Sequence, residues 1–368
     1  MKFKLPIVLA CALCLLSSCD KINQKTVLKI EYYLAGNEYV GESTVPVLYR
    51  DGAESIRLKT DDFVKSASMG KDCVYSCGYH AEGDIKKPMV WKDNLSYELK
   101  EKDSKGNLTA LDCEYGWFNQ ALYTSIGCLS VGVIDDCGVL YNNSDEMFRI
   151  ENKDSRIEFT HIMLLGNNYV LLGGYNDDSI MLWNLHYNSE KKEFSLNSSS
   201  APNPQLMEYE KYSYELSSIC NAASGTVMAF TRTDKVTGET IACYYANEHL
   251  SIVEKAQNGS VCLTSMYDGF NLVFGGYTLY EEDKYEKACC WSQGRDQDFS
   301  TDYEHQHSKV FQLNMDYYGN TYVATDGREK TIIYLYSQFG SGTIENKHSA
   351  SFKASSISYK ISTEIVKE

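Results

Sequence analysis

Two neighbouring segments, Leu171-Leu172-Gly173-Gly174-Tyr175 and Met181-Leu182-Trp183-Asn184, decide the fold because their pattern recurs along the chain. The first is typical of an apolar strand that ends on glycine, and the second of a strand that ends on an aromatic residue and a polar turn. The sequence holds seven copies, two of which lack the glycine. The repeat glycines are Gly36, Gly78, Gly132, Gly174 and Gly276, and the closing aromatic residues are Tyr49, Trp91, Tyr141, Trp183, Tyr245, Trp291 and Tyr336.

The spacing of the closing aromatic residues, 42 to 62 positions, indicates a β-propeller. A unit of about 40–50 residues accommodates four short strands and their turns. The two residues before each closing aromatic are mostly apolar, which predicts a strand covered on both faces, as in blades that stack on one another. We therefore expect an all-β propeller with seven four-stranded blades. Six blades, with the first copy packed outside the ring, is the alternative.

The C-terminal segment is predicted to close the ring. The first copy lacks a strand ahead of its glycine strand, and the alternating segment Ser356–Ile361 is left over after the last copy. Pairing this segment beside Leu28–Tyr33 would remove two open sheet edges. We also expect Asn188–Tyr212 to be an insertion between the fourth and fifth blades, and Tyr280–Lys287 to be a long hairpin tip in the sixth.

The ten cysteines that follow Cys19 are predicted to be buried thiols rather than a disulfide framework. In the repeat, Cys243 and Cys289 take positions that hold apolar residues in other copies. Cys73 and Cys77 lie four residues apart on one expected strand, about 13 Å, which is too far for a disulfide bond.

The N-terminus has the pattern of a secretion signal. Lys2 and Lys4 precede an apolar stretch that is too short to span a membrane. The ending Leu16-Ser17-Ser18-Cys19 resembles the bacterial lipobox, which implies that Cys19 is diacylated and becomes the new N-terminus. An ordinary signal peptide with a chance cysteine is the alternative. The expected organisation is a lipoprotein signal peptide over 1–18, the lipidated cysteine and a short tether over 19–26, and the propeller over 27–368.

The formal net charge of −15 becomes −17 when Lys2 and Lys4 are removed with the signal peptide. Such a chain is repelled by phosphate backbones and anionic headgroups, so the sequence predicts no nucleic-acid partner. No later stretch approaches the ~20 apolar residues of a spanning helix, so attachment to a membrane is expected through the lipid. The predicted location is the cell membrane or the outer membrane, facing the periplasm or the exterior.

The repeats are similar to those of propeller lipoproteins from Bacteroidetes-type bacteria. The likeness rests on the Gly-Gly-Tyr strand with its aromatic and polar turn. It rests also on Asp316-Tyr317-Tyr318-Gly319-Asn320-Thr321-Tyr322-Val323, which resembles the opening of bacterial propeller repeats. The resemblance covers nearly all of the mature chain. It implies a fold and a location, and it supplies no catalytic residues. Asp20-Lys21 leaves the final membrane leaflet open.

Motifs that carry catalysis in other families are missing from the sequence. It contains no sialidase-type Asp box, Gly-x-Ser-x-Gly elbow, His-Glu-x-x-His motif or P-loop. His305 and His307 are candidate metal ligands, but they lie in a polar segment without a third ligand nearby. Asp135-Asp136 and Asn176-Asp177-Asp178 are candidate calcium ligands, but Asx residues at a β-turn suffice to explain them. The sequence thus predicts no catalytic residue, metal or cofactor.

Two hypotheses about function follow. In the first, a membrane-anchored lipoprotein uses one propeller face to bind or scaffold a glycan or a protein. In the second, the propeller is a hydrolase or lyase that acts on polysaccharide. The sequence favours the first, and convergent acids or histidines with exposed aromatic rings on one face would favour the second.

Overall fold

The computed structural model describes residues 24–367 except 269–270, 281–284, 293–294, 298–307, 316–320, 328 and 338–339. The predicted signal peptide, Cys19, His305 and His307 lie outside the described residues, as does most of the Asp316–Val323 motif. In the part of the chain that is described, no helix is both long enough and apolar enough to cross a membrane.

The chain divides into two compact units. The smaller unit joins the residues up to Tyr32 with those from Tyr359 onward, and its described residues are strand. The larger unit, Tyr33–Ser358, holds the propeller. Two strands contribute to both units, namely β1 (Gln24–Val40) and β30 (Phe352–Lys367).

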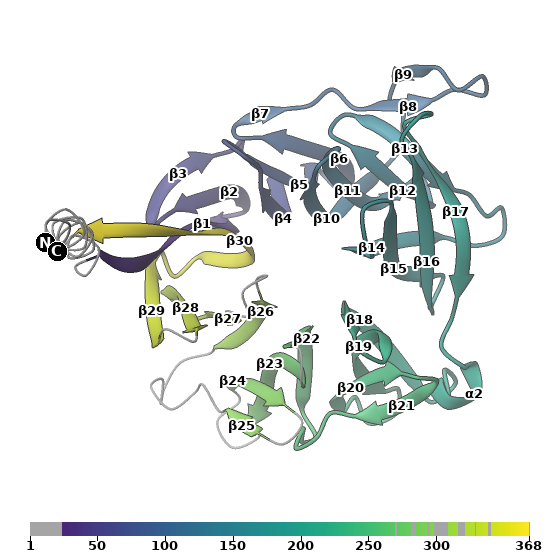
Figure 1. Cartoon of the computed structure of the whole chain (residues 1–368). Helices are drawn as coiled ribbons and strands as arrows, with labels where there is room; N and C mark the ends of the chain where they lie inside the picture. Colours follow the sequence, from purple (N-terminus) through teal and green to yellow (C-terminus); the bar gives the residue numbers. More distant parts are fainter. Residues whose placement is uncertain are drawn as a thin grey trace, which may run out of the picture. The chain divides into compact units, whose positions relative to one another are not determined.

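The larger unit is a seven-bladed β-propeller, and in Figure 1 the first strand of each blade lies nearest the centre of the ring. Blade 1 is completed by β2 (Ser43–Arg50) and β3 (Ala53–Arg57). Blade 2 contains β4 (Asp62–Met69), β5 (Val74–Glu82), β6 (Ile85–Lys92) and β7 (Leu95–Ser96). Blade 3 contains β10 (Gly116–Thr124), β11 (Gly127–Ile134), β12 (Cys137–Asn142) and β13 (Asp145–Ile150), with the extra hairpin β8 (Lys100–Lys102) and β9 (Leu108–Ala110).

The remaining blades follow the same order from the centre outward. Blade 4 contains β14 (Ile157–Leu164), β15 (Tyr169–Asn176), β16 (Ser179–Asn188) and β17 (Glu193–Ser200). The short helix α2 (Pro204–Met207) leads to blade 5, with β18 (Tyr212–Ala222), β19 (Gly225–Asp234), β20 (Thr240–Ala246) and β21 (His249–Ile252). Blade 6 contains β22 (Ser260–Tyr267), β23 (Leu272–Tyr280), β24 (Tyr285–Ser292) and β25 (Arg295–Gln297). Blade 7 contains β26 (Lys309–Met315), β27 (Thr321–Asp326), β28 (Lys330–Ser337) and β29 (Gly340–Lys347).

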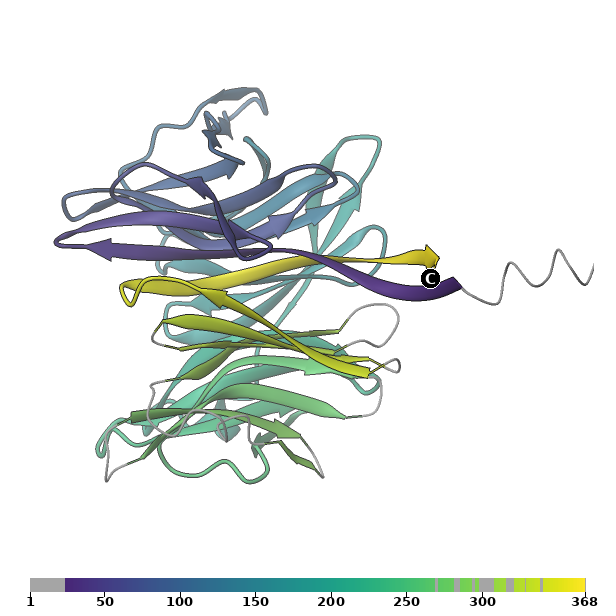
Figure 2. The same ribbon diagram turned by 90° about the vertical axis from the view of Figure 1, so that its left-hand side faces the viewer.

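The C-terminal strand closes the ring, as predicted. β30 is the innermost strand of blade 1, beside β1, and the two run together in Figure 2. Tyr39 donates its backbone N–H to the Ser351 carbonyl (3.1 Å), and the Ser355 hydroxyl donates to the Ala35 carbonyl (3.2 Å). Both contacts precede the predicted segment in β30, and their antiparallel register places Ile357 opposite Tyr33, the end of the predicted Leu28–Tyr33. Because the first copy is paired inside a blade, the six-blade alternative is wrong.

The closing aromatic residues all lie on the third strands of their blades. Trp91, Trp183 and Trp291 are 2%, 3% and 7% exposed, which confirms that they are buried at matching positions. Tyr49, Tyr141 and Tyr245 are buried in the same way, while the side chain of Tyr336 lies outside the described residues. Stacking of the blades therefore covers both faces of the third strand.

The repeat glycines stand opposite a β-bulge in the inner strand. Gly174 pairs with Phe159, and the register shifts directly after Phe159. A Cβ atom on Gly174 would lie 2.0 Å from the Glu158 carbonyl oxygen, a distance that no side chain tolerates. Glycine is required here because the two backbones approach each other closely. A Cβ atom on any of the other four repeat glycines would likewise lie 2.4 Å or less from a backbone oxygen of the inner strand.

Polar side chains that follow the bulges join each inner strand to the next blade. They replace sheet hydrogen bonds, which the separate inner strands lack, and they satisfy buried backbone groups. The bonds join Ser356 Oγ to Ala67 N (2.7 Å), Ser68 Oγ to Tyr123 N (2.8 Å), Gln120 Oε1 to Ile162 N (2.7 Å), Ser218 Oγ to Ser265 Oγ (2.5 Å), Thr264 Oγ1 to Leu313 N (3.2 Å) and the Gln312 amide to both backbone groups of Ile357 (2.8 Å each).

His161 performs this joining role between blades 4 and 5, and it makes stability depend on pH. Its Nε2–H donates to the Ser217 carbonyl (2.9 Å), and Nδ1 accepts from the Thr160 hydroxyl (2.9 Å), so the neutral ring satisfies both partners. Burial lowers the pKa of His161 to about 4. The neutral His161 ring therefore contributes fully to the free energy of unfolding above pH 6.5, the ordinary histidine pKa. This contribution is lost as the pH falls toward 4.

We expect the wild type to lose about 3 kcal/mol more free energy of unfolding between pH 7.5 and 4.5 than His161→Gln does. Glutamine fits because Gln120 and Gln312 occupy the equivalent positions in blades 3 and 7. Urea denaturation at the two pH values measures the difference. Equal losses in both proteins would show that His161 does not govern acid stability.

The cysteines are confirmed as thiols. All ten described cysteines carry thiols rather than disulfide bonds, and seven of them are buried: Cys77, Cys128, Cys137, Cys220, Cys243, Cys262 and Cys290. Cys243 and Cys289 pair with Phe230 and Gly276, which is the position held by apolar residues in other blades. Burial raises the pKa of Cys243 to about 12, so this thiol is unreactive at neutral pH.

Two predictions about connections need correction. The segment Asn188–Tyr212 is not an insertion, because it contains β17, the outer strand of blade 4, followed by α2. Its serine-rich end, Ser198–Ser200, lacks an apolar pattern because this strand is exposed at the edge. The hairpin of blade 6 is also shorter than Tyr280–Lys287, since β23 reaches Tyr280 and β24 begins at Tyr285.

Candidate functional site at the centre of the ring

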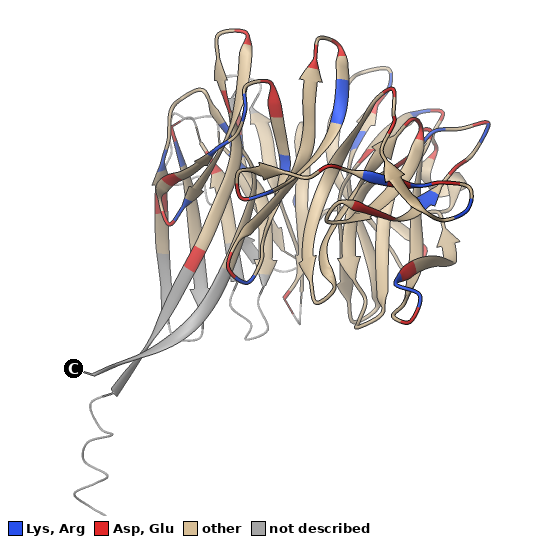
Figure 3. Cartoon of the chain, turned by 90° about the horizontal axis from the view of Figure 1, so that it is seen from above, with Lys and Arg blue, Asp and Glu red and all other residues tan. Residues whose placement is uncertain are grey.

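The hairpins between second and third strands define one face of the propeller, which we call the upper face; the inner strands begin on this side. Figure 3 shows that Lys, Arg, Asp and Glu gather in loops and at strand ends, whereas the strand interiors carry few charges. The hairpin tips Asp135-Asp136 and Asp177-Asp178 lie on the upper face.

The aspartates of these tips are turn residues. Asp135 Oδ1 accepts the backbone N–H groups of Glu114 and Tyr115 (2.9 and 3.0 Å), and Asp177 Oδ1 accepts that of Arg156 (2.9 Å). These carboxylates therefore fix the entry of the next inner strand. Among the described residues, no group of three or more His, Cys, Asp or Glu side chains is arranged to hold a metal ion.

Six side chains of blades 2 to 4 form a group on the upper face, which we call the central cluster. Blade 2 contributes Lys65 from β4 and Lys86 from β6, blade 3 contributes Trp117 and Asn119 from β10, and blade 4 contributes Arg156 and Glu158 at the start of β14. Lys65 and Asn119 are the extra residues of the inner-strand bulges. In blades 2 and 3 the bulge of the inner strand therefore directs Lys65 or Asn119 into the central cluster.

Glu158 is the anchor of the central cluster. Its Oε1 accepts from Trp117 Nε1 (2.9 Å) and from Asn119 Nδ2 (2.9 Å), and its Oε2 accepts from Arg156 Nη2 (2.7 Å). Three donors, one of them charged, thus converge on this carboxylate. Glu158 therefore positions the other members of the cluster.

Trp117 fixes two cations beside its indole ring. Lys86 Nζ lies 4.9 Å from the ring centroid and Arg156 Cζ lies 4.8 Å from it, distances that permit cation–π attraction. Lys86 Nζ is also 5.0 Å from the ring of Tyr79, which stacks on Phe63 at 4.7 Å. The ammonium group of Lys86 is therefore held between two aromatic rings.

Lys65 projects from the inner strand of blade 2, and charged groups of the non-neighbouring blades 4 and 5 influence its pKa. This places Lys65 near the centre of the ring. Burial lowers the pKa of Lys65, Lys86 lowers it further, and Glu158 of blade 4 and Glu215 of blade 5 oppose the shift. In the described part of the chain, neither Lys65 nor Lys86 has an ion-pair or hydrogen-bond partner for its ammonium group. Two adjacent positive charges without direct ion-pair partners make a site for an anion.

Sequence reasoning did not identify the central cluster. The predicted repeat residues stabilise the blades instead. The glycines leave room for the bulged inner strands, and the aromatic residues pack between adjacent sheets. The usable signal was the position of Lys65, the only lysine among the bulge residues of blades 2 to 7, which are Lys65, Asn119, Thr160, Ser217, Leu263 and Phe311. Recognising that position required the bulge, which the sequence pattern did not reveal.

Comparison with known proteins gives only distant likeness in shape. No family model matches the sequence, and no curated protein does. A Bacteroides uniformis structure, whose assignment as a 6-phosphogluconolactonase is itself provisional, matches at 10% identity and a TM-score of 0.46, covering 90% of this chain and 99% of its own. The Dos1 propeller matches at 9% identity and a TM-score of 0.45, covering 81% of this chain and 72% of its own. Such likeness in shape transfers no activity.

Proposed function

We propose that the protein is a lipid-anchored binding module that holds an acidic glycan on its upper face, at the central cluster. The observation that carries this proposal is the pair Lys65 and Lys86, two neighbouring ammonium groups without a direct ion-pair or hydrogen-bond partner among the described residues. The whole chain has a formal net charge of −15, so a concentrated positive site stands out from its surroundings. A carboxylate or sulfate group on a sugar would supply the missing charge.

The aromatic rings make this site preorganised. Tyr79 and Trp117 hold the Lys86 ammonium group, and Glu158 holds Trp117 in place through its indole N–H. A cation fixed before binding loses less conformational entropy when the ligand arrives. Cation–π contacts also leave the N–H donors of Lys86 available for the ligand.

The proposed location follows from the sequence. Lys2, Lys4, the apolar stretch after them and the ending Leu16-Ser17-Ser18-Cys19 support diacylation of Cys19 and attachment to a cell membrane or outer membrane. A tether of a few residues would keep the propeller close to that membrane. Glycans of the cell envelope or the surroundings would then be within reach.

Binding to polygalacturonate, a uniformly acidic glycan, tests the proposal. We expect Lys86→Gln to weaken binding about tenfold and the double variant Lys65→Gln/Lys86→Gln about a hundredfold, because each charge-assisted hydrogen bond contributes about 1.5–3 kcal/mol. Lys71→Gln is the matched control, since Lys71 lies in the turn between β4 and β5 at the opposite end of the same blade. Affinity electrophoresis through gels with and without the polymer measures the effect.

Equal retention of the double variant and the wild type would contradict the proposed site. Equal retention in gels of a neutral polymer, such as dextran, would contradict the acidic specificity.

A polysaccharide lyase is the second candidate, favoured by the lowered pKa of Lys65. A neutral Lys65 amine would take the proton on the carbon next to a uronate carboxyl group. The glycosidic oxygen would then leave with its bonding electrons and acquire a proton, which leaves a carbon–carbon double bond in the uronate. Growth of ultraviolet absorbance on incubation with polygalacturonate, lost in Lys65→Gln, would favour the lyase over the binding module.

A further inference from the structure

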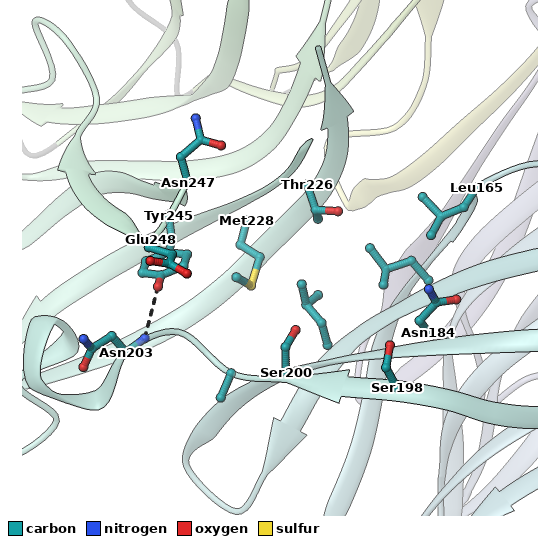
Figure 4. A pocket seen from close by; sticks show the side chains of 13 residues that line it. Leu165, Asn184, Ser198, Ser200, Asn203, Thr226, Met228, Tyr245, Asn247 and Glu248 are labelled. Atoms are coloured by element: carbon teal, nitrogen blue, oxygen red, sulfur yellow. Dashed lines mark hydrogen bonds between the residues drawn. The ribbon is translucent and has the colours of Figure 1, made fainter. Parts of the chain in front are cut away.

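A cavity lies between blades 4 and 5 (Figure 4), and it is lined by none of the residues of the central cluster. Its volume is about 580 Å³, within the range of small-molecule sites. β16 and β17 form one wall, and the ends of β19 and β20 form the other. Leu171, Leu182 and Met228 give the cavity an apolar base, and the Tyr245 ring stands beside them.

The register of β16 and β17 directs polar side chains into this cavity. Leu182 pairs with Ser200 and Asn184 with Ser198, so these four side chains share one face of blade 4. The residues between them, Trp183 and Ser199, point to the other face, and Trp183 packs toward blade 3. The hydroxyl groups of Ser198 and Ser200 thus stand above the apolar base.

Asn184, a residue of the wall, carries a polar atom without a partner. Its Oδ1 is buried and has no hydrogen-bond partner among the described residues, while the residue lines the cavity. Leaving a buried acceptor unpaired is costly. Rotation of the amide toward the cavity would bring this oxygen to a donor on a bound molecule.

The backbone at the rim supplies a second observation. Asn247 and Glu248 form the turn between β20 and β21 and have φ angles of 51° and 63°. Hairpin turns of this kind favour glycine at the second position, because a side chain is strained there. Glu248 nevertheless occupies it and lines the cavity. The hairpin Asp135-Asp136 has the same conformation, with φ angles of 46° and 63°, so the turn geometry serves here to place the Glu248 carboxylate at the rim.

We propose that this cavity binds one neutral sugar residue. The lining residues include one carboxylate, Glu248, and no lysine or arginine, which opposes an anionic ligand. The apolar base and the Tyr245 ring suit the C–H face of a sugar. Asn184, Ser198, Ser200 and Glu248 suit its hydroxyl groups. This site is independent of the central cluster, whose charge favours the opposite class of ligand.

Saturation-transfer NMR with four neutral disaccharides tests the proposal: lactose, maltose, cellobiose and N,N′-diacetylchitobiose, with glucuronate as the acidic control. We expect at least one neutral disaccharide to give signals that Ser200→Trp abolishes, because the indole fills the cavity. Ser199→Trp is the matched control on the same exposed strand and should keep the signals. Thermal melting checks that both variants are folded.

The proposal is overturned if none of the four sugars gives a signal, if Ser200→Trp keeps it, or if glucuronate gives an equal signal that Ser200→Trp removes. Lys65→Gln/Lys86→Gln should leave the neutral sugar signal unchanged, which separates this site from the proposed function.

Glu248→Gly provides a second measurement. Glycine relieves the left-handed turn, so we expect the melting temperature to rise by about 1–3 °C. We expect the affinity for the neutral sugar to fall about fivefold, because the carboxylate acceptor is lost. A variant that is more stable and binds equally well would remove Glu248 from the proposed site.

Discussion

Replacing Trp183 with alanine is expected to lower the free energy of unfolding by about 3–5 kcal/mol, because it leaves a cavity between two blades. The indole is 3% exposed and meets the ring of Phe159 edge to face, with 4.9 Å between centroids. It also packs with Leu172 and Leu185 in the apolar cluster between blades 3 and 4.

Chemical denaturation of wild type and variant measures this loss. Tyr169→Ala is the control, because Tyr169 lies on the neighbouring strand β15 but is 40% exposed, and a loss of less than about 1 kcal/mol is expected. A loss below about 1 kcal/mol for Trp183→Ala would contradict the packing of the third strands described above.

Deletion of residues 355–368 is expected to cause aggregation or a large fall in melting temperature. The deletion removes the innermost strand of blade 1, so β1 and the adjoining blades lose a pairing partner. It also removes four joining bonds at the seam: one from Ser356 to Ala67, one from Ser358 to Met69 and two between Gln312 and Ile357. The buried side chain of Ile357 is lost with them.

Deletion of residues 361–368 alone is the matched control, because these residues belong to the smaller unit. This shorter deletion should melt within a few degrees of the wild type. If the longer deletion also melts within a degree or two of the wild type, β30 does not close the ring.

The ring of blades could be predicted because the residues that its packing requires recur in the copies of the repeat. A bulged inner strand requires glycine opposite it, as at Gly78 and Gly174, and a strand covered on both faces requires the apolar residues before Trp91 or Trp183. An outer strand of a blade requires neither this glycine nor an apolar pattern on both faces. β17 pairs on one side only and is mostly exposed, so its serine-rich end was interpreted as a loop.

The candidate sites could not be predicted, because they depend on contacts between blades. Lys65, Glu158 and Glu215 are far apart in the sequence and influence one another only because the ring brings their blades around one centre. The cavity beside Asn184 likewise needs two blades. A single repeat specifies how a blade folds, and the side chains that meet between blades follow from the closed ring.

Calorimetric titration with trigalacturonate, at low and at physiological ionic strength, tests the central claim most directly. The account predicts that the wild type binds the acidic trisaccharide, that added salt weakens the binding, and that Lys65→Gln/Lys86→Gln removes both the binding and its salt dependence while Lys71→Gln keeps them. Binding of equal strength in the double variant, or binding by the wild type that is insensitive to salt, would contradict it.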